Sequence, residues 1–396
     1  MPQTFVRDRF TWQMYLMLGF YGYLLNLFGP MTPYLQSDLH LSYAQASFHY
    51  TAFAFGMILA GIIGTRLTIR LGVLKSIWFG GFGMSLGALL FFAGKAPAVT
   101  IGASFWMGLA GSQILSLVPG LLSTRHGARG AVALTEANVI AGLISITGPL
   151  VVRGLAVSSL GWRAALILPV IFLAGLYLIF GRGGPEGSFQ PARETEKENK
   201  LPWKYWVYWA QIVCGVAVEF CMIFWGATYL QNVTGLPRAA AASATSLFMG
   251  GMIAGRMAGS RLLHSQPPGR VLLGALSICA LGFGIFWSAG SALLSLAGFA
   301  LAGLGTANFY PVSITMAIQA AGTAVNKAST RATLASGTAI IALPLLLGGL
   351  ADAVGLRLAF LVVPVLLAIT LGILFLSSRL KRPGSQIAER ETICEN

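Results

Sequence analysis

The chain has 396 residues, of which 56% are hydrophobic and only 10% are charged. Soluble globular proteins carry about 25% charged residues, so this chain lacks the polar surface that a water-facing body of its size needs. With a mean hydropathy of +0.75, the composition excludes collagen, coiled coils, disordered chains and disulfide-stapled secreted domains, and it indicates a polytopic helical membrane protein.

Apolar stretches of roughly 20 residues, long enough to cross a bilayer, recur along the whole chain. Backbone groups in lipid must satisfy their own hydrogen bonds, so runs of this length form helices. We predict twelve spans, at residues 11–35, 44–67, 74–94, 98–122, 131–156, 162–181, 205–231, 239–263, 270–288, 291–318, 331–351 and 357–378. The expected fold class is an all-α membrane protein with twelve transmembrane helices.

The formal net charge of +14 reflects orientation in the membrane rather than nucleic-acid binding, because the basic residues are dispersed among the short breaks between apolar runs. With the N-terminus in the cytoplasm, the outer side receives few of the 26 Lys and Arg residues, namely Lys95, Arg153, Arg163, Arg238 and Arg357. This asymmetry predicts an integral plasma (inner) membrane protein with both termini in the cytoplasm.

A polar break at residues 182–204 (RGGPEGSFQPARETEKENKLPWK) separates the first six spans from the last six. Its Gly, Pro, Glu and Lys content is typical of a flexible cytoplasmic linker. The predicted domains are an N-terminal six-helix bundle at 1–181, this linker at 182–204, and a C-terminal six-helix bundle with a short cytoplasmic tail at 205–396.

The second half of the chain repeats the first in one register. Residues 56–67 (GMILAGIIGTRL) match residues 251–262 (GMIAGRMAGSRL), and residues 108–113 (GLAGSQ) match residues 303–308 (GLGTAN). Both pairs are separated by the same offset, which indicates an internal duplication. Each half has an even number of spans, so the halves share one orientation and form a parallel repeat about an axis along the membrane normal.

These features resemble those of the major facilitator superfamily over essentially the full length of the chain. The resemblance rests on the repeat of six and six spans, the charged linker, GTRLTIRLGVLK at 64–75 with its copy after the eighth span, Gly148-Pro149, and GWRAA at 161–165. Ile69 occupies the position that is acidic in the loop signature of that family. The resemblance implies two six-helix bundles around a central cavity lined by helices 1, 4, 7 and 10.

Glu219 is the most informative single residue, because it falls near the middle of the seventh predicted span. An acid at the centre of a membrane helix costs roughly 2.5–3.5 kcal/mol even on the lowest scales, so it suggests a functional site. Gln211, Gly215 and Met222 share its helix face, which suggests a face turned away from lipid. Proton or substrate handling is one interpretation, and a structural acid bonded to a neighbouring helix is the other.

Further polar and aromatic side chains at mid-membrane depth are candidate substrate-binding residues. They are Tyr23, Asn26, Gln113, Trp225, Asn308 and Tyr310. The resemblance places the polar ones around the central cavity with Glu219, and Gln113 and Asn308 hold the same position in the repeat. For each polar residue an interhelical hydrogen bond is the alternative interpretation.

Three charged residues near the predicted cytoplasmic ends are candidates for gating. Arg66 and Arg261 lie at the inner ends of the second and eighth spans, where snorkelling of a long side chain would also explain them. Glu136 lies near the start of the fifth span, where an acid can stabilise a helix N-terminus. Capping and gating are equally open for Glu136.

Enzymatic motifs and cofactor sites are not found, and the protein is expected not to be an enzyme and to need no cofactor or metal. The sequence predicts a secondary transporter that moves a small organic solute by alternating access, with proton-coupled uptake favoured. Proton-antiport efflux of drugs or metabolites is the alternative, and a transporter-like membrane sensor is an alternative of another class. The expected partners are the solute, protons and the lipid bilayer, without nucleic acid, and the protein is expected to be a monomer.

Overall fold

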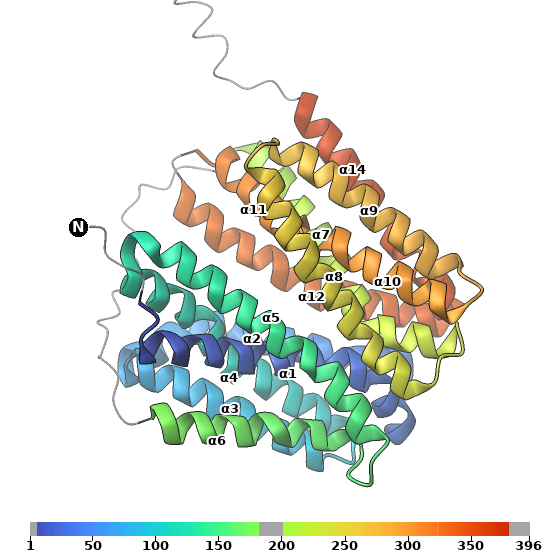
Figure 1. Ribbon diagram of the computed structural model, residues 1–396, viewed down its shortest axis with the longest axis horizontal. Coiled ribbons are helices and arrows are strands. Elements are labelled where there is room, and N and C mark those ends of the chain that lie inside the picture. Colours follow the sequence, from blue (N-terminus) through green and yellow to red (C-terminus); the bar gives the residue numbers. More distant parts are fainter. Residues whose placement is uncertain (1–5, 182–200, 323, 380–396) are drawn as a thin grey trace, which may run out of the picture.

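The structure, a computed structural model, describes residues 6–181, 201–322 and 324–379. Helices in this part of the chain form two groups that lie side by side, the first coloured blue to green and the second yellow to red (Figure 1). This arrangement confirms the predicted all-α fold of two six-helix bundles. Residues 182–200 of the predicted linker and 380–396 of the tail lie outside the described residues.

The first group contains six long helices, joined by short connections. They are α1 (Arg9–Leu39), α2 (Tyr43–Leu71), α3 (Val73–Ala93), α4 (Pro97–His126), α5 (Gly130–Ala156) and α6 (Ile167–Phe180), with the short 3-10 helices η1 (Gly127–Arg129) and η2 (Trp162–Leu166) before α5 and α6.

The second group repeats this order, although two of its spans are interrupted. Its helices are α7 (Trp203–Asn232), α8 (Arg238–Leu263), α9 (Pro268–Ser288), α10 (Ala292–Thr306), α11 (Phe309–Ala320), α12 (Val325–Val354), α13 (Leu356–Ala359) and α14 (Val362–Arg379). The span predicted at 291–318 is thus two helices, broken at Ala307 and Asn308.

Ten helical stretches in the described part are long and apolar enough to cross a membrane. The sequence predicts twelve spans, and the two that fall short of this criterion are α1 and α8. Both are long enough, at 31 and 26 residues. Most of α1 is buried among other helices, and α8 is rich in Gly, Ala and Ser. Neither helix therefore needs the apolar surface of a lipid-facing span.

The internal repeat recurs as repeated helix contacts. Gly108 of α4 lies directly against the Phe53 carbonyl oxygen of α2, and Gly303 of α10 lies against the Phe248 carbonyl oxygen of α8 in the same way. A Cβ atom at either glycine would collide with that backbone. Because only glycine allows two helices to approach this closely, the matching sequence positions make the same close crossing in both halves.

A second repeated feature precedes the last helix of each half. Gly161 and Gly355 have φ angles of 74° and 85°, a left-handed region that disfavours residues with a Cβ. Each glycine turns the chain into a short helix, η2 after Gly161 and α13 after Gly355. The similar segments GWRAA and GLRLA thus form the same turn.

Candidate functional site

The two halves meet closely where α1 and α2 face α7. The ring of Tyr50 stacks on that of Phe224, with centroids 3.9 Å apart, and the Tyr50 hydroxyl donates to the Phe224 carbonyl oxygen at 3.3 Å. Gly29 of α1 lies against the Ile223 carbonyl oxygen, where a Cβ would collide with it. Both Tyr50 and Phe224 are fully buried, so this contact is tightly packed.

A second contact joins α2 to α12. The carboxylate of Asp352 accepts hydrogen bonds from the Ser42 hydroxyl at 2.8 Å and from the backbone N–H groups of Tyr43 and Ala44 at 2.8 and 2.9 Å. Deeper in the bundle, the Ser47 hydroxyl donates to the Pro344 carbonyl oxygen at 3.0 Å. An acid of the second half therefore caps a helix of the first.

A third contact joins α5 to α8. The Ser246 hydroxyl donates to the Ile146 carbonyl oxygen at 2.8 Å, and the Arg153 guanidinium donates to the Ser243 hydroxyl at 3.3 Å. All three contacts lie toward one end of the bundle, where α1, α5, α7 and α12 end and where α2 and α8 begin. We call this the closed end, and the end at which α1 begins the opposite end.

Glu219 lies just beyond the first of these contacts. It is four residues, about one helical turn, from Ile223 on α7, in the direction of the opposite end. Its side chain is partly exposed. Arg256 of α8 and Tyr310 of α11 are the charged and titratable groups that interact electrostatically with it. The site defined by Glu219, Arg256 and Tyr310 combines an acid that can carry a proton, a cation that can bind an anion, and a phenol that can donate a hydrogen bond.

Arg256 is exposed although it lies in the interior of a membrane-spanning helix. One turn closer to the closed end, Ile253 of α8 packs against Gly142 of α5, at the edge of the α5–α8 contact. Arg256 therefore lies one turn from this contact, in the direction of the opposite end.

The face of α7 that carries Glu219 is buried in the second half, as its sequence predicts. The Gln211 amide donates to the Ser313 hydroxyl of α11 at 2.8 Å, and Gly215 lies against Phe309. Met222 is fully buried. These contacts fix α7 against α11 and hold Glu219 away from lipid.

Asn26 and Tyr23 of α1 have different surroundings. Asn26 is partly exposed, lies three residues before Gly29, and donates only to the Gly22 carbonyl oxygen of its own helix at 2.8 Å. Tyr23 is buried, and its hydroxyl donates to the Ala165 carbonyl oxygen at 3.3 Å within the first half. Asn26 is thus placed beside the crossing of α1 and α7, whereas Tyr23 is engaged inside its own bundle.

Gln113 and Asn308 occupy corresponding places, as the repeat predicts. The Gln113 amide packs against Gly64 of α2, and the Asn308 amide packs against Gly259 of α8. Asn308 also donates to the Gly255 carbonyl oxygen at 2.9 Å. The structure therefore places both amides between two helices of one half, in the break between α10 and α11 for Asn308.

Trp225 belongs to the closed end. It is fully buried, and its indole N–H donates to the Pro344 carbonyl oxygen at 3.1 Å. Its ring lies edge-on to Tyr43 and Tyr50 of the first half. Of the predicted binding residues, Tyr310 is within electrostatic reach of Glu219 and Asn26 lies beside the α1–α7 crossing, whereas Trp225 is packed into the contact at the closed end.

The three predicted gating residues lie toward the opposite end. Arg66 and Arg261 are exposed near the ends of α2 and α8. Glu136 forms an ion pair with Arg7 at 2.6 Å and accepts a hydrogen bond from the Tyr15 hydroxyl at 3.1 Å, all within the first half. Because α5 begins at Gly130, Glu136 lies beyond the first turn, so the capping interpretation is wrong.

Sequence reasoning missed two functional candidates, Arg256 and Asp352. Neither residue follows from the sequence features described above, although Arg256 pairs in the repeat register with Gly61, an uncharged position. In the described part of the chain, Cys214, Cys221 and Cys279 are buried and free, and no three acids, histidines or cysteines cluster as metal ligands.

Comparison with known proteins identifies the family to which the chain is similar. A family model described as Major Facilitator Superfamily matches residues 14–299. An uncharacterized MFS-type transporter of Yersinia pestis is 25% identical over 92% of this chain and 95% of its own. The fold is also similar to a bacterial homologue of the human lysosomal transporter Spinster in an inward-facing, unoccupied conformation (14% identity, 93% and 96% of the two chains, TM-score 0.72) and to the peptide transporter POT in complex with sulfate (13% identity, 93% and 94%, TM-score 0.73).

Proposed function

Because the chain belongs to the major facilitator superfamily, we propose that it is a secondary transporter that takes up a small organic solute by alternating access and couples uptake to protons through Glu219. The observation that carries the proposal is the position of Glu219, partly exposed, one turn from the α1–α7 crossing and within electrostatic reach of Arg256 and Tyr310. A carboxylate at this depth is costly, and such residues commonly mark proton or substrate pathways.

The contacts at the closed end support alternating access. The Tyr50–Phe224 stack, the Asp352 cap and the α5–α8 hydrogen bonds all lie on one side of Glu219. If both termini are cytoplasmic, as the distribution of Lys and Arg predicts, the closed end is the outer one and this state faces inward. Transport then requires these contacts to open while others form at the opposite end. Arg66, Arg261 and Glu136 are our candidates for residues that form the contacts at the opposite end.

Glu219 supports proton coupling because protonation removes its charge. A carboxylate beside Arg256 forms a charge-compensated pair, and the protonated acid leaves the guanidinium free to attract an anionic group. Substrate and proton can then enter together, with the proton on Glu219 and an acidic part of the solute near Arg256. Asn26 and Tyr310 are the proposed neutral contacts, and Tyr23, Gln113, Trp225 and Asn308 are proposed to shape the site from the surrounding helices.

A proton-flux experiment distinguishes this proposal from its alternatives. Solutes that raise the thermal unfolding temperature of the purified protein are added outside proteoliposomes that contain a pH-sensitive dye. Symport acidifies the lumen, antiport makes it more alkaline, and a sensor leaves its pH unchanged. We expect acidification, and we expect Glu219→Gln to abolish it while the solute still raises the unfolding temperature. A Glu219→Gln protein that still acidifies the lumen would show that Glu219 is a structural acid.

A further inference from the structure

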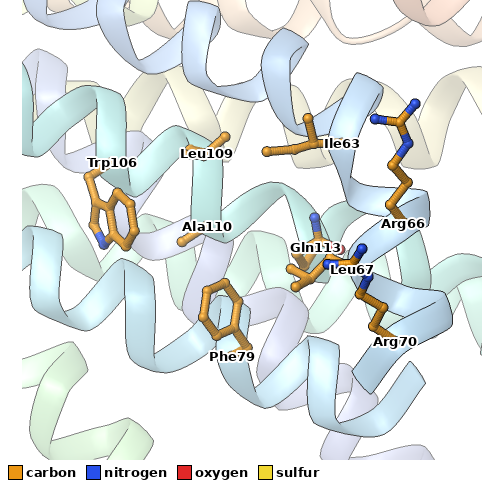
Figure 2. A pocket seen from close by; sticks show the side chains of 9 residues that line it. All are labelled: Ile63, Arg66, Leu67, Arg70, Phe79, Trp106, Leu109, Ala110 and Gln113. Atoms are coloured by element: carbon orange, nitrogen blue, oxygen red, sulfur yellow. The ribbon is translucent and has the colours of Figure 1, made fainter. Parts of the chain in front are cut away.

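A lateral groove lies between α2, α3 and α4 of the first half, far from the Glu219 site in the fold. It has a volume of about 490 Å³, and six of the nine residues that line it are apolar. In Figure 2, Trp106 lies at one extremity of the groove and Arg66 and Arg70 lie at the other, with Phe79 and Ala110 between them. The groove is therefore apolar along its length and basic at one extremity.

The groove faces outward from the bundle. Ile58 of α2 packs against Gly337 of α12, in the other half. Leu67, which lines the groove, is nine residues from Ile58 and so lies on the opposite face of the helix, at 100° per residue. Ile63 and Phe79 on its walls are 41% and 42% exposed. Such apolar surface on membrane helices is covered by lipid chains.

The basic extremity lies near the end of α2, at the opposite end of the bundle. Arg66 and Arg70 are five residues and one residue from the end of α2, within about 8 Å of it along the helix axis. On α4, Trp106 lies seven residues before Gln113, so the apolar part extends about 10 Å along this helix in the direction of the closed end. A molecule with a charged head and an apolar tail could therefore place its head at the arginines and its tail along the apolar part of the groove.

The charge of the two arginines is not compensated within the part of the chain that the structure describes. Three of its five acidic residues form ion pairs elsewhere, Asp8 with Arg125, Asp38 with Arg163 and Glu136 with Arg7. Asp352 accepts hydrogen bonds at the N-terminus of α2, and Glu219 lies on α7 in the other half, within electrostatic reach of Arg256. Between the two arginines, Leu67, Thr68 and Ile69 carry no charge. The groove thus presents two guanidinium groups to an anion.

The internal repeat provides a comparison for this groove. A second groove of about 290 Å³ lies between α8, α9 and α10, and its lining includes Ala258, Leu262, Gly274, Leu304 and Asn308, the repeat counterparts of Ile63, Leu67, Phe79, Leu109 and Gln113. The counterpart of Arg66 is Arg261, which does not line the second groove, and the counterpart of Arg70 is Ser265. The second groove is lined by one arginine, Arg270. Only the groove of the first half therefore has the arginine pair.

From this geometry we propose that the α2–α3–α4 groove binds an anionic phospholipid of the leaflet at the opposite end. Its phosphate binds Arg66 and Arg70, and one acyl chain lies along Ile63, Phe79 and Leu109 toward Trp106. Basic pockets between membrane helices hold lipid headgroups in this manner. A free anion would use the arginines and leave the apolar part of the groove unused.

Native mass spectrometry of the full-length protein tests the proposal. The protein is mixed with dioleoyl phosphatidylglycerol and dioleoyl phosphatidylcholine, which have the same chains and differ in headgroup charge. We expect preferential binding of phosphatidylglycerol. Arg66→Gln and Arg70→Gln should each reduce that preference about 5-fold, and the double variant about 30-fold, because an arginine near an anionic headgroup contributes about 1 kcal/mol. Both side chains are exposed, and an unchanged unfolding temperature confirms that each variant is folded.

Arg261→Gln is the matched control, since Arg261 is the repeat counterpart of Arg66 and is an exposed arginine that does not line the second groove. It should leave the preference unchanged. If Arg261→Gln reduces the preference for phosphatidylglycerol as much as Arg66→Gln does, the preference comes from general attraction of the lipid to surface charge. That result would overturn the proposal. Displacement of the lipid by inorganic phosphate would show that the arginines take a free anion instead, and equal binding of both lipids by the wild-type protein would also refute the site.

Discussion

The carboxylate of Asp352, at the end of α12, accepts a hydrogen bond at 2.8 Å from the backbone N–H of Tyr43, the first residue of α2 in the other half. The first N–H groups of a helix have no partner within the helix, and they attract negative charge. Asp352 also accepts from the Ser42 hydroxyl and the Ala44 N–H. One side chain therefore joins the halves at the closed end through three hydrogen bonds that must break when this end opens.

We predict that Asp352→Asn opens the closed end more often. Hydrogen bonds to a charged group contribute about 1.5–3 kcal/mol, so loss of the charge should shift the ratio of open to closed molecules about tenfold. Spin labels at Ser159 and Val354, exposed residues of the two halves at the closed end, should show a larger population of long distances.

Asp38→Asn is the control for this prediction. Asp38 also lies at the closed end, but it accepts from the Trp162 indole at 3.0 Å and pairs with Arg163, both in its own half. Its replacement should leave the distance distribution unchanged. If Asp352→Asn behaves like Asp38→Asn, the cap does not hold the closed end.

We predict that alanine at either repeat-related glycine, Gly108 or Gly303, destabilises the protein. The new methyl group would collide with the backbone of Phe53 or Phe248, and overpacking of this kind costs about 1–3 kcal/mol. Thermal unfolding should show a lower midpoint for both variants. Gly102→Ala, in the same helix as Gly108 but with open space around it, should leave the midpoint unchanged or raise it, because alanine favours the helix.

We predict that the contact between Asp8 and Arg125 is insensitive to pH between 5 and 8. Partial burial alone would raise the pKa of Asp8, but hydrogen bonds from Thr11 and Arg125 lower it from 3.8 to about 2. A lowered pKa in the folded state means that the stabilisation is complete above about pH 4 and is lost as the pH falls toward 2. Asp8→Asn should therefore lower the unfolding temperature equally at pH 5 and pH 8.

The size of that effect is small, because the pair is partly exposed and such pairs contribute about 1 kcal/mol or less. The pH profile of transport should be the same in Asp8→Asn as in the wild-type protein. A shifted profile would mean that the N-terminal segment, and not the intramembrane site, senses pH.

The sequence predicts the helices because each is a continuous apolar stretch. It predicts the repeat because glycines recur at matching positions in the two halves. The break at Ala307 and Asn308 could not be predicted, since the chain is apolar on both sides of it. Gln113 and Asn308 were correctly paired, but a sequence does not show that each amide packs against a glycine of a neighbouring helix. The partners of Asp352 lie more than 300 residues away and depend on how the halves meet.

Arg256 provides the most direct test of how Glu219 works, because it is the cation that acts on that carboxylate. A nearby positive charge favours the ionised form of an acid. Arg256→Gln should therefore let Glu219 hold its proton at higher pH. In the proteoliposome assay, we expect the pH of half-maximal proton-coupled uptake to rise, and we expect weaker binding if the solute is anionic. Arg261→Gln, five residues along the same helix and on another face, should not move that pH, whatever it does to the rate. If the half-maximal pH is unchanged in Arg256→Gln, Arg256 does not take part in proton coupling. Its role would then be limited to binding the solute.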